Sequence, residues 1–203
     1  MQWSRTRHHS CLSWLAAACA LCISTPALAH EVGESAGGFF SGLSHPVSGL
    51  DHVAAMIAVG LWGAQLGNPA LWILPVMFPL VMATGGFLGL VGIPLPAVEV
   101  GIALSAIVLG LMVVLQARPP LVTSIAIVSV FAVFHGHAHG TELPEGQNGL
   151  VYSIGFVLAT GLLHLVGILI GTIHYWERGK IALRTLGGLV LVGGLYFFWR
   201  AIE

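Results

Sequence analysis

Long apolar runs alternate along the chain with short breaks that contain glycine, proline or charged residues. Each run is roughly 17–25 residues long, which is the length of an α-helix that crosses a bilayer. The breaks lie at residues 67–69, 92–94, 118–120, 141–148 and 177–180. The pattern predicts six transmembrane helices, near residues 45–66, 70–91, 96–117, 121–140, 149–174 and 181–199.

The first 29 residues have the three parts of a secretory signal peptide. Arg5 and Arg7 precede an apolar stretch over about residues 12–23, and the residues at 27–29 match the small-x-small cleavage rule. The alternative, an uncleaved first helix, needs about 20 apolar residues, more than this stretch contains. We expect cleavage, which makes His30 the mature N-terminus and residues 30–203 a single integral membrane domain.

A cleaved signal peptide places the mature N-terminus outside the membrane, and six crossings then fix the side of every connection. The basic residues expected on the cytoplasmic side are Arg118, Arg178, Lys180 and Arg184, with Arg200 outside. The acids expected outside are Glu31, Glu34, Glu142, Glu145 and Glu203. This distribution agrees with the positive-inside rule.

The composition excludes several classes of protein. The chain is 57% hydrophobic and 7% charged, with a mean hydropathy of +0.93, whereas a soluble domain is about a quarter charged. We therefore expect an all-α, polytopic membrane helix bundle. A net charge of -1 without a basic cluster gives no support for nucleic-acid binding. The chain has no Walker A motif and no HExxH motif, so we expect neither ATP hydrolysis nor hydrolysis at an HExxH zinc site.

Ionisable residues within the apolar runs are the candidate functional residues, because such groups are costly in hydrocarbon and usually functional there. All three cysteines lie in the predicted signal peptide, so imidazole and carboxylate groups are the available metal ligands. The candidate metal ligands are His30, His45, Asp51, His52, Glu99, His135, His137, His139 and His164. Most lie toward the external side, which predicts a path for a divalent metal ion.

The segment from His45 to His52 carries three of these candidates within eight residues. We expect it to open one helix, with Pro46 in its first turn. His45 and His52 would then share a face, and Asp51 would lie about 100° away, toward neighbouring helices. The alternative is a buried hydrogen-bonding acid flanked by interfacial histidines.

Glu99 shares a helical stripe with Ala103, Ala106 and Gly110. Small residues mark close helix packing, so we expect Glu99 to point into the bundle. The alternative is an interfacial acid that favours a helix N-terminus.

The string His135-Gly136-His137-Ala138-His139-Gly140 is the most metal-like motif. In a regular helix His135 and His139 share a face, while His137 points away. All three converge only if the glycines distort the last turn. A surface histidine tract is the alternative.

For two further histidines, the sequence is consistent with a metal ligand and also with a residue that binds no metal. At ~1.5 Å per residue, His164 lies near the middle of the bilayer, as an inner relay ligand or as a structural hydrogen-bonding group. His30 offers a ring and a freed α-amine to a metal, or belongs to a mobile terminus.

The strings HPVSGLDHVAAMIAVGLWGAQLG and FHGHAHGTELP, with a signal peptide ending just before a histidine, resemble the HupE/UreJ family of nickel/cobalt transporters. The resemblance covers essentially the whole mature chain. It implies a bacterial inner-membrane permease that supplies Ni²⁺ or Co²⁺ for hydrogenase or urease maturation, without a prosthetic group. It also implies that the functional positions include His45, Asp51, His52, Glu99, His135, His137 and His139.

We therefore predict uptake of a divalent metal ion from the periplasm, with Ni²⁺ first and Co²⁺ second, and no enzymatic activity. The alternatives are a b-type cytochrome with facing histidines, such as His52 and His164, and an intramembrane metalloenzyme centred on the HGHAHG string. Expected partners are the metal ion, the lipid bilayer and, indirectly, maturation proteins. The oligomeric state stays open, and a homo-oligomer is one arrangement we consider.

Overall fold

The computed structural model describes residues 37–203, except for residues 144, 145 and 147. The predicted signal peptide and His30 lie outside the described residues. The described elements are α2 (Gly37–Ser48), α3 (Leu50–Leu66), α4 (Ala70–Leu90), α5 (Val98–Leu115), α6 (Leu121–Thr141), α7 (Gly149–Gly171), the 3₁₀-helix η1 (Thr172–Tyr175) and α8 (Glu177–Ile202).

Within this part of the chain, five helices are long and apolar enough to cross a membrane. The pair α2 and α3 counts as a sixth span if the two are taken as one broken helix. The prediction of an all-α, polytopic membrane bundle is confirmed. The helices α4 to α8 each begin and end within four residues of the predicted bounds, when η1 is counted with α7.

The first predicted span is wrong in one respect. It is not one helix over residues 45–66, because α2 ends at Ser48 and α3 begins at Leu50 with a bend of 81° between them. Gly49 adopts an extended conformation at the break, where a residue without a side chain is a poor helix former. Pro46 lies inside α2 and not in the first turn of a helix. His45 and His52 therefore belong to different helices.

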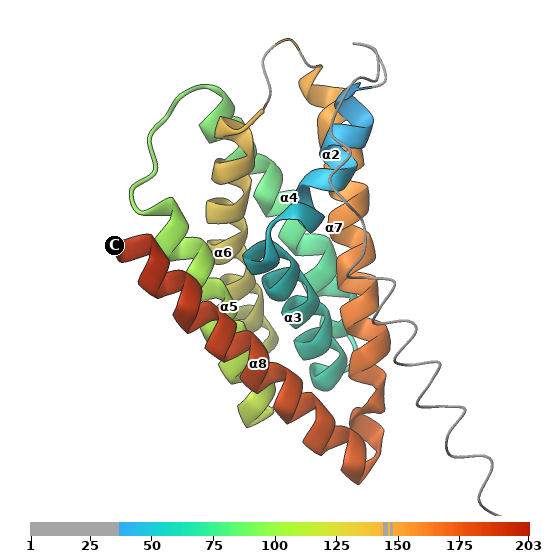
Figure 1. Cartoon of the computed structure of the whole chain (residues 1–203). Helices are drawn as coiled ribbons and strands as arrows, with labels where there is room; N and C mark the ends of the chain where they lie inside the picture. The colour runs from blue at the N-terminus through green and yellow to red at the C-terminus, as the bar shows by residue number, and fades with distance from the viewer. Residues whose placement is uncertain (1–36, 144–145, 147) are drawn as a thin grey trace, which may run out of the picture. The chain divides into compact units, whose positions relative to one another are not determined.

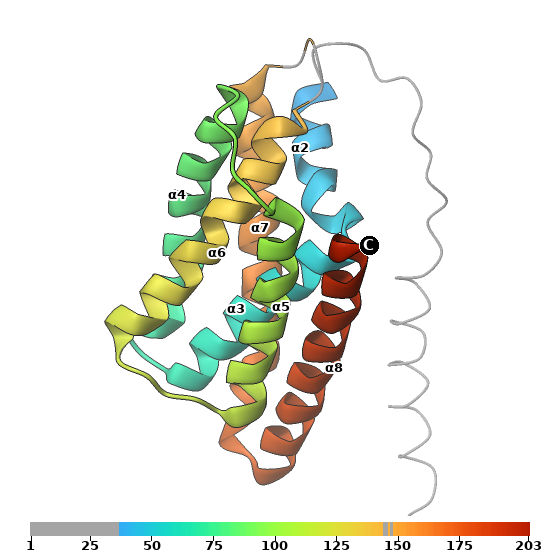
Figure 2. The same cartoon turned by 90° about the vertical axis from the view of Figure 1, so that its left-hand side faces the viewer.

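The broken pair crosses the middle of the bundle (Figure 1). α2 packs along α7, and α3 packs against α4, α5 and α7. This central position explains why most side chains of α3 from Ala55 to Gln65 are buried. α4 lies beside α6, and α5 lies beside α8 (Figure 2).

The contact between α4 and α6 depends on glycines. A Cβ atom at Gly136 would overlap the carbonyl oxygen of Met82, and one at Gly140 would overlap that of Gly86. The two backbones therefore approach more closely than any other side chain would allow, as in small-xxx-small contacts of membrane helices.

This contact determines where the histidines of α6 point. Residues His135 and His139 directly precede the two glycines, so they project about 100° around the helix from the face that meets α4. Both are buried. They lie on the side of α6 that faces the broken helix.

We expect Gly136→Ala to lower the free energy of unfolding by about 1–3 kcal/mol, because its methyl group forces α4 and α6 apart. The matched control is Gly161→Ala in α7, where a Cβ atom would meet nothing within 4 Å. The control should change stability by no more than about 1 kcal/mol, in the stabilising direction. Thermal unfolding in detergent, followed by tryptophan fluorescence, measures both. Equal effects would contradict the proposed close contact.

Candidate metal site

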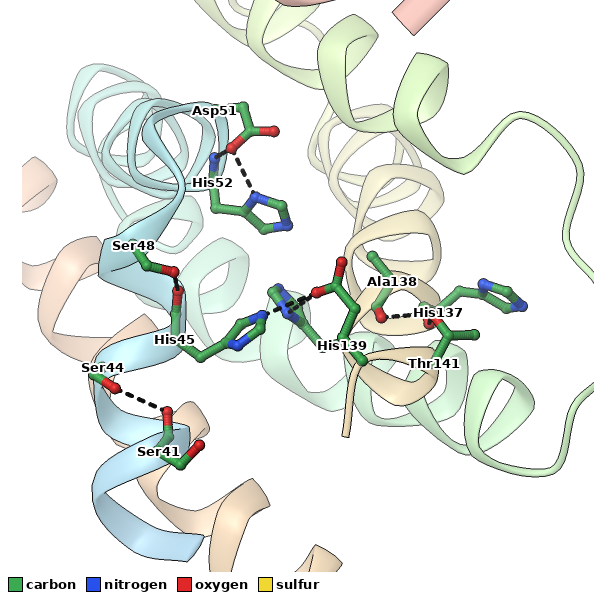
Figure 3. A network of polar contacts seen from close by, with 11 residues as sticks. Ser41, Ser44, His45, Ser48, Asp51, His52, His137, Ala138, His139 and Thr141 are labelled. Atoms are coloured by element: carbon green, nitrogen blue, oxygen red, sulfur yellow. Dashed lines mark hydrogen bonds and ion pairs between the residues drawn. The ribbon is translucent and has the colours of Figure 1, made fainter. Parts of the chain in front are cut away.

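Three ligand groups from two distant segments of the chain meet at one end of the bundle. His45 of α2 places Nε2 3.0 Å from Oε2 of Glu142, which directly follows α6. His139 Nδ1 lies 3.9 Å from the same oxygen. One ligand atom from each of the three residues lies within 4.8 Å of the other two. Figure 3 shows His45 and His139 pointing toward one another across the gap between α2 and α6.

A second group continues directly from His139 into the bundle. The ring centroids of His52 and His139 are 4.6 Å apart, and those of His52 and His135 are 5.0 Å apart. The ring centroids of His45 and His139 are also close, at 4.7 Å. We call the six residues that this chain of contacts connects the histidine cluster: His45, Asp51, His52, His135, His139 and Glu142.

The break between α2 and α3 leaves Asp51 and His52 half-buried, with the His52 ring facing the histidines of α6. Asp51 lies in the first turn of α3, where the free amide groups favour a negative charge. Its Oδ1 accepts hydrogen bonds from the backbone N–H of His52 at 2.8 Å and from Nδ1 of the same residue at 2.9 Å. The carboxylate thereby fixes the orientation of the His52 ring.

Hydrogen bonds at Nδ1 leave the other ring nitrogen of two histidines available as a ligand. His52 donates from Nδ1 to Asp51, and His135 donates from Nδ1 to the Phe131 carbonyl oxygen at 2.9 Å. Nε2 of both residues is buried without a hydrogen-bond partner among the described residues. Metal-binding histidines are commonly oriented in this way, through the nitrogen that does not touch the metal.

The buried ring nitrogens need a physical explanation. A buried polar group without a partner costs about 1–3 kcal/mol, and the cluster holds several such nitrogens, including both of His139. A divalent cation would satisfy these lone pairs, and the carboxylates of Asp51 and Glu142 would offset its charge. Imidazole nitrogen with carboxylate oxygen suits borderline metals such as Ni²⁺, Co²⁺ and Zn²⁺.

His139 also lines a pocket of about 350 Å³ between α4, α6 and α7. The remainder of the wall is mainly apolar, with Met82, Phe87 and Phe156 among its side chains. The imidazole of His139 thus lies between this pocket and the other members of the cluster.

The structure does not bring Glu99 into the histidine cluster. The residue lies in the first turn of α5, and its side chain is exposed. The expectation that it points into the bundle is wrong, although Ala103, Ala106 and Gly110 of the same stripe are buried. One turn at the helix end is enough to take Glu99 beyond the packed part of the stripe.

His137 is also separate from the cluster. α6 is regular through Thr141, so the glycines do not distort the last turn, and His137 points away as a regular helix requires. Its Nε2 lies 2.8 Å from the Ile93 carbonyl oxygen in the connection between α4 and α5. Figure 3 shows it on the far side of α6 from His45.

The residue that sequence reasoning missed is Glu142, which was expected only as an external acid. Its spacing of three residues from His139 could have indicated this role, because residues i and i+3 share a helix face.

The facing pair suggested for a haem, His52 with His164, is not formed. His52 contacts the rings of His135 and His139, and His164 contacts Phe78.

Two comparisons with known proteins find relatives of this chain. The model of the HupE / UreJ protein family matches residues 17–197 of the chain. Protein HupE of Rhizobium leguminosarum bv. viciae is 44% identical over 173 residues, which cover 85% of this chain and 91% of that protein. No solved structure matches the chain significantly.

We expect Glu142→Gln to weaken Ni²⁺ binding to the purified protein by at least about tenfold, or about 1.4 kcal/mol. The reason is that the substitution removes one negative charge from the group formed with His45 and His139. Equilibrium dialysis measures the change. Glu177→Gln, an exposed residue of α8 paired with Lys180, serves as the matched control and should bind Ni²⁺ normally. Equal affinities for the two variants would exclude Glu142 as a ligand.

Proposed function

The chain belongs to the HupE/UreJ family, and from this premise we propose that it carries divalent transition-metal ions across a bacterial inner membrane into the cytoplasm. Ni²⁺ is the first candidate and Co²⁺ the second. The observation that supports this most is the convergence of His45, His139 and Glu142 from two separate helical segments. A transport path needs ligands that lead from the exposed end of the bundle into its apolar part, where such groups are otherwise costly.

The histidine cluster suggests how the ion leaves water. His45 and Glu142 are partly exposed, with side-chain exposures of 26% and 51%, so they meet the hydrated ion first. His139 is 6% exposed and contacts both His45 and His52. The ion exchanges water for protein ligands in short steps and passes from His139 to His52 and His135. Each site must bind only moderately, because an ion held too tightly is not released.

The membrane potential supplies the direction of transport. An inside-negative potential of 100 mV favours inward movement by about 2.3 kcal/mol per charge, or about 4.6 kcal/mol for a divalent ion. Passive facilitation is therefore sufficient. The exposed carboxylate of Glu99 lies at the N-terminus of α5 and would raise the local cation concentration before binding.

The inward direction agrees with a role in metal supply. We propose that the imported ion serves maturation of hydrogenase or urease, with the mature N-terminus on the periplasmic side. The chain contributes no prosthetic group to this process, since the metal ion is the transported substrate.

We expect Asp51→Asn to reduce uptake of radiolabelled nickel by cells to the background of cells without the protein. The amide lacks the charge that offsets a divalent ion and that orients the His52 ring. Loss of such an outer-shell carboxylate typically costs about 10–100-fold in metal affinity.

The amount of Asp51→Asn protein in the membrane should stay normal, as measured by immunoblot, since the side chain keeps its shape. Glu177→Gln should transport normally and controls for removal of a charge elsewhere. Wild-type uptake by the Asp51→Asn variant would refute the role of Asp51. Competition with Co²⁺ and Zn²⁺ in the same assay ranks the metals.

A further inference from the structure

His164 of α7 is a buried histidine outside the histidine cluster. It is 1% exposed, and its ring centroid is 5.3 Å from that of Phe78. The same phenyl ring lies 5.4 Å from the His135 ring, at the inner end of the cluster. Phe78 thus connects the cluster with a histidine deeper along the bundle.

The orientation of His164 depends on two prolines of α4. Pro79 has no backbone N–H, so the carbonyl oxygen of Pro75, four residues earlier, has no partner within the helix. His164 Nδ1 lies 3.2 Å from this oxygen and donates to it. The hydrogen bond places the lone pair on Nε2, which is buried without a hydrogen-bond partner among the described residues.

Thr160 provides a second unpartnered polar atom on the same face of α7. It lies one turn before His164 and is fully buried. A threonine hydroxyl within a helix usually donates to the carbonyl oxygen four residues earlier. The Thr160 hydroxyl has no partner within the described residues. It remains available, as Nε2 of His164 does.

We propose that His164 and Thr160 form an inner binding site for the transported divalent cation, and that the Phe78 ring separates this site from the histidine cluster. The inference rests on the proposed function and extends it from one site to two. Imidazole nitrogen and hydroxyl oxygen form a neutral donor pair, in contrast to the cluster with its two carboxylates. The ion is therefore held less strongly at the inner site, as onward release requires.

A thiol at position 164 tests whether the metal reaches this depth. The variant His164→Cys is made in a chain whose natural cysteines at 11, 19 and 22 are replaced by serine. Co²⁺ is added to the purified protein, because a cobalt–thiolate bond gives a near-ultraviolet charge-transfer band that nitrogen and oxygen ligands do not give. We expect the band to appear with His164→Cys. The matched control is Leu165→Cys, at an exposed position of α7, and it should give no band.

Transport kinetics provide the second measurement. His164→Gln keeps a donor for the Pro75 carbonyl oxygen and loses the ring nitrogen. We expect the maximal rate of nickel uptake to fall at least about tenfold, while the dissociation constant for Ni²⁺ at the cluster changes less than about twofold. Glu142→Gln should do the reverse: its main effect should be a raised dissociation constant for Ni²⁺ at the cluster.

The outcomes separate the two proposals. A missing cobalt–thiolate band in a His164→Cys protein that still binds Co²⁺ would overturn the inner site and leave the proposed function intact. Wild-type nickel uptake by His164→Gln would also overturn the inner site and leave the proposed function intact. Failure of the unsubstituted protein to bind Ni²⁺ or Co²⁺ would overturn the proposed function itself.

Discussion

The close approach of α6 to α4 orients the histidines on which the site depends. Glycine at 136 and 140 allows the two backbones to touch, and the residues just before them must then point elsewhere. His135 and His139 contact rings of α2, α3, α4 and α7, because the neighbouring side of α6 packs directly on the backbone of α4. The glycines of this string therefore fix the rotation of α6 about its own axis, and this rotation determines the direction of the histidine side chains.

The break at Gly49 supplies the other half of the site. A continuous first span would keep the amide groups of residues 50–52 bonded to the preceding turn, whereas the bend starts a new helix there. Asp51 occupies this new N-terminus and fixes the ring of His52. Broken helices carry binding sites in several families of membrane transporter, because free amide ends at membrane depth are tolerated only within the protein or along a cavity.

Three histidines whose Nε2 atom is buried share one hydrogen-bonding arrangement. Nδ1 is paired with an oxygen in each case, from Asp51 for His52, from Phe131 for His135 and from Pro75 for His164. Each Nε2 then faces the interior without a protein partner. Burial of several such nitrogens opposes folding, so their presence in one connected series is better explained by a ligand than by packing.

The sequence by itself determined the membrane class, the bounds of α4 to α8 and the kinds of ligand available, because helix length and hydropathy are local properties. It also determined the family, through strings around His45 and His135. Only the tertiary structure decided that Glu142 joins the cluster, that Glu99 stays exposed and that Phe78 leads on to His164. These outcomes depend on the bend at Gly49 and on the rotation of each helix. Both follow from which faces of neighbouring helices pack together, and that information is spread over segments far apart in the chain.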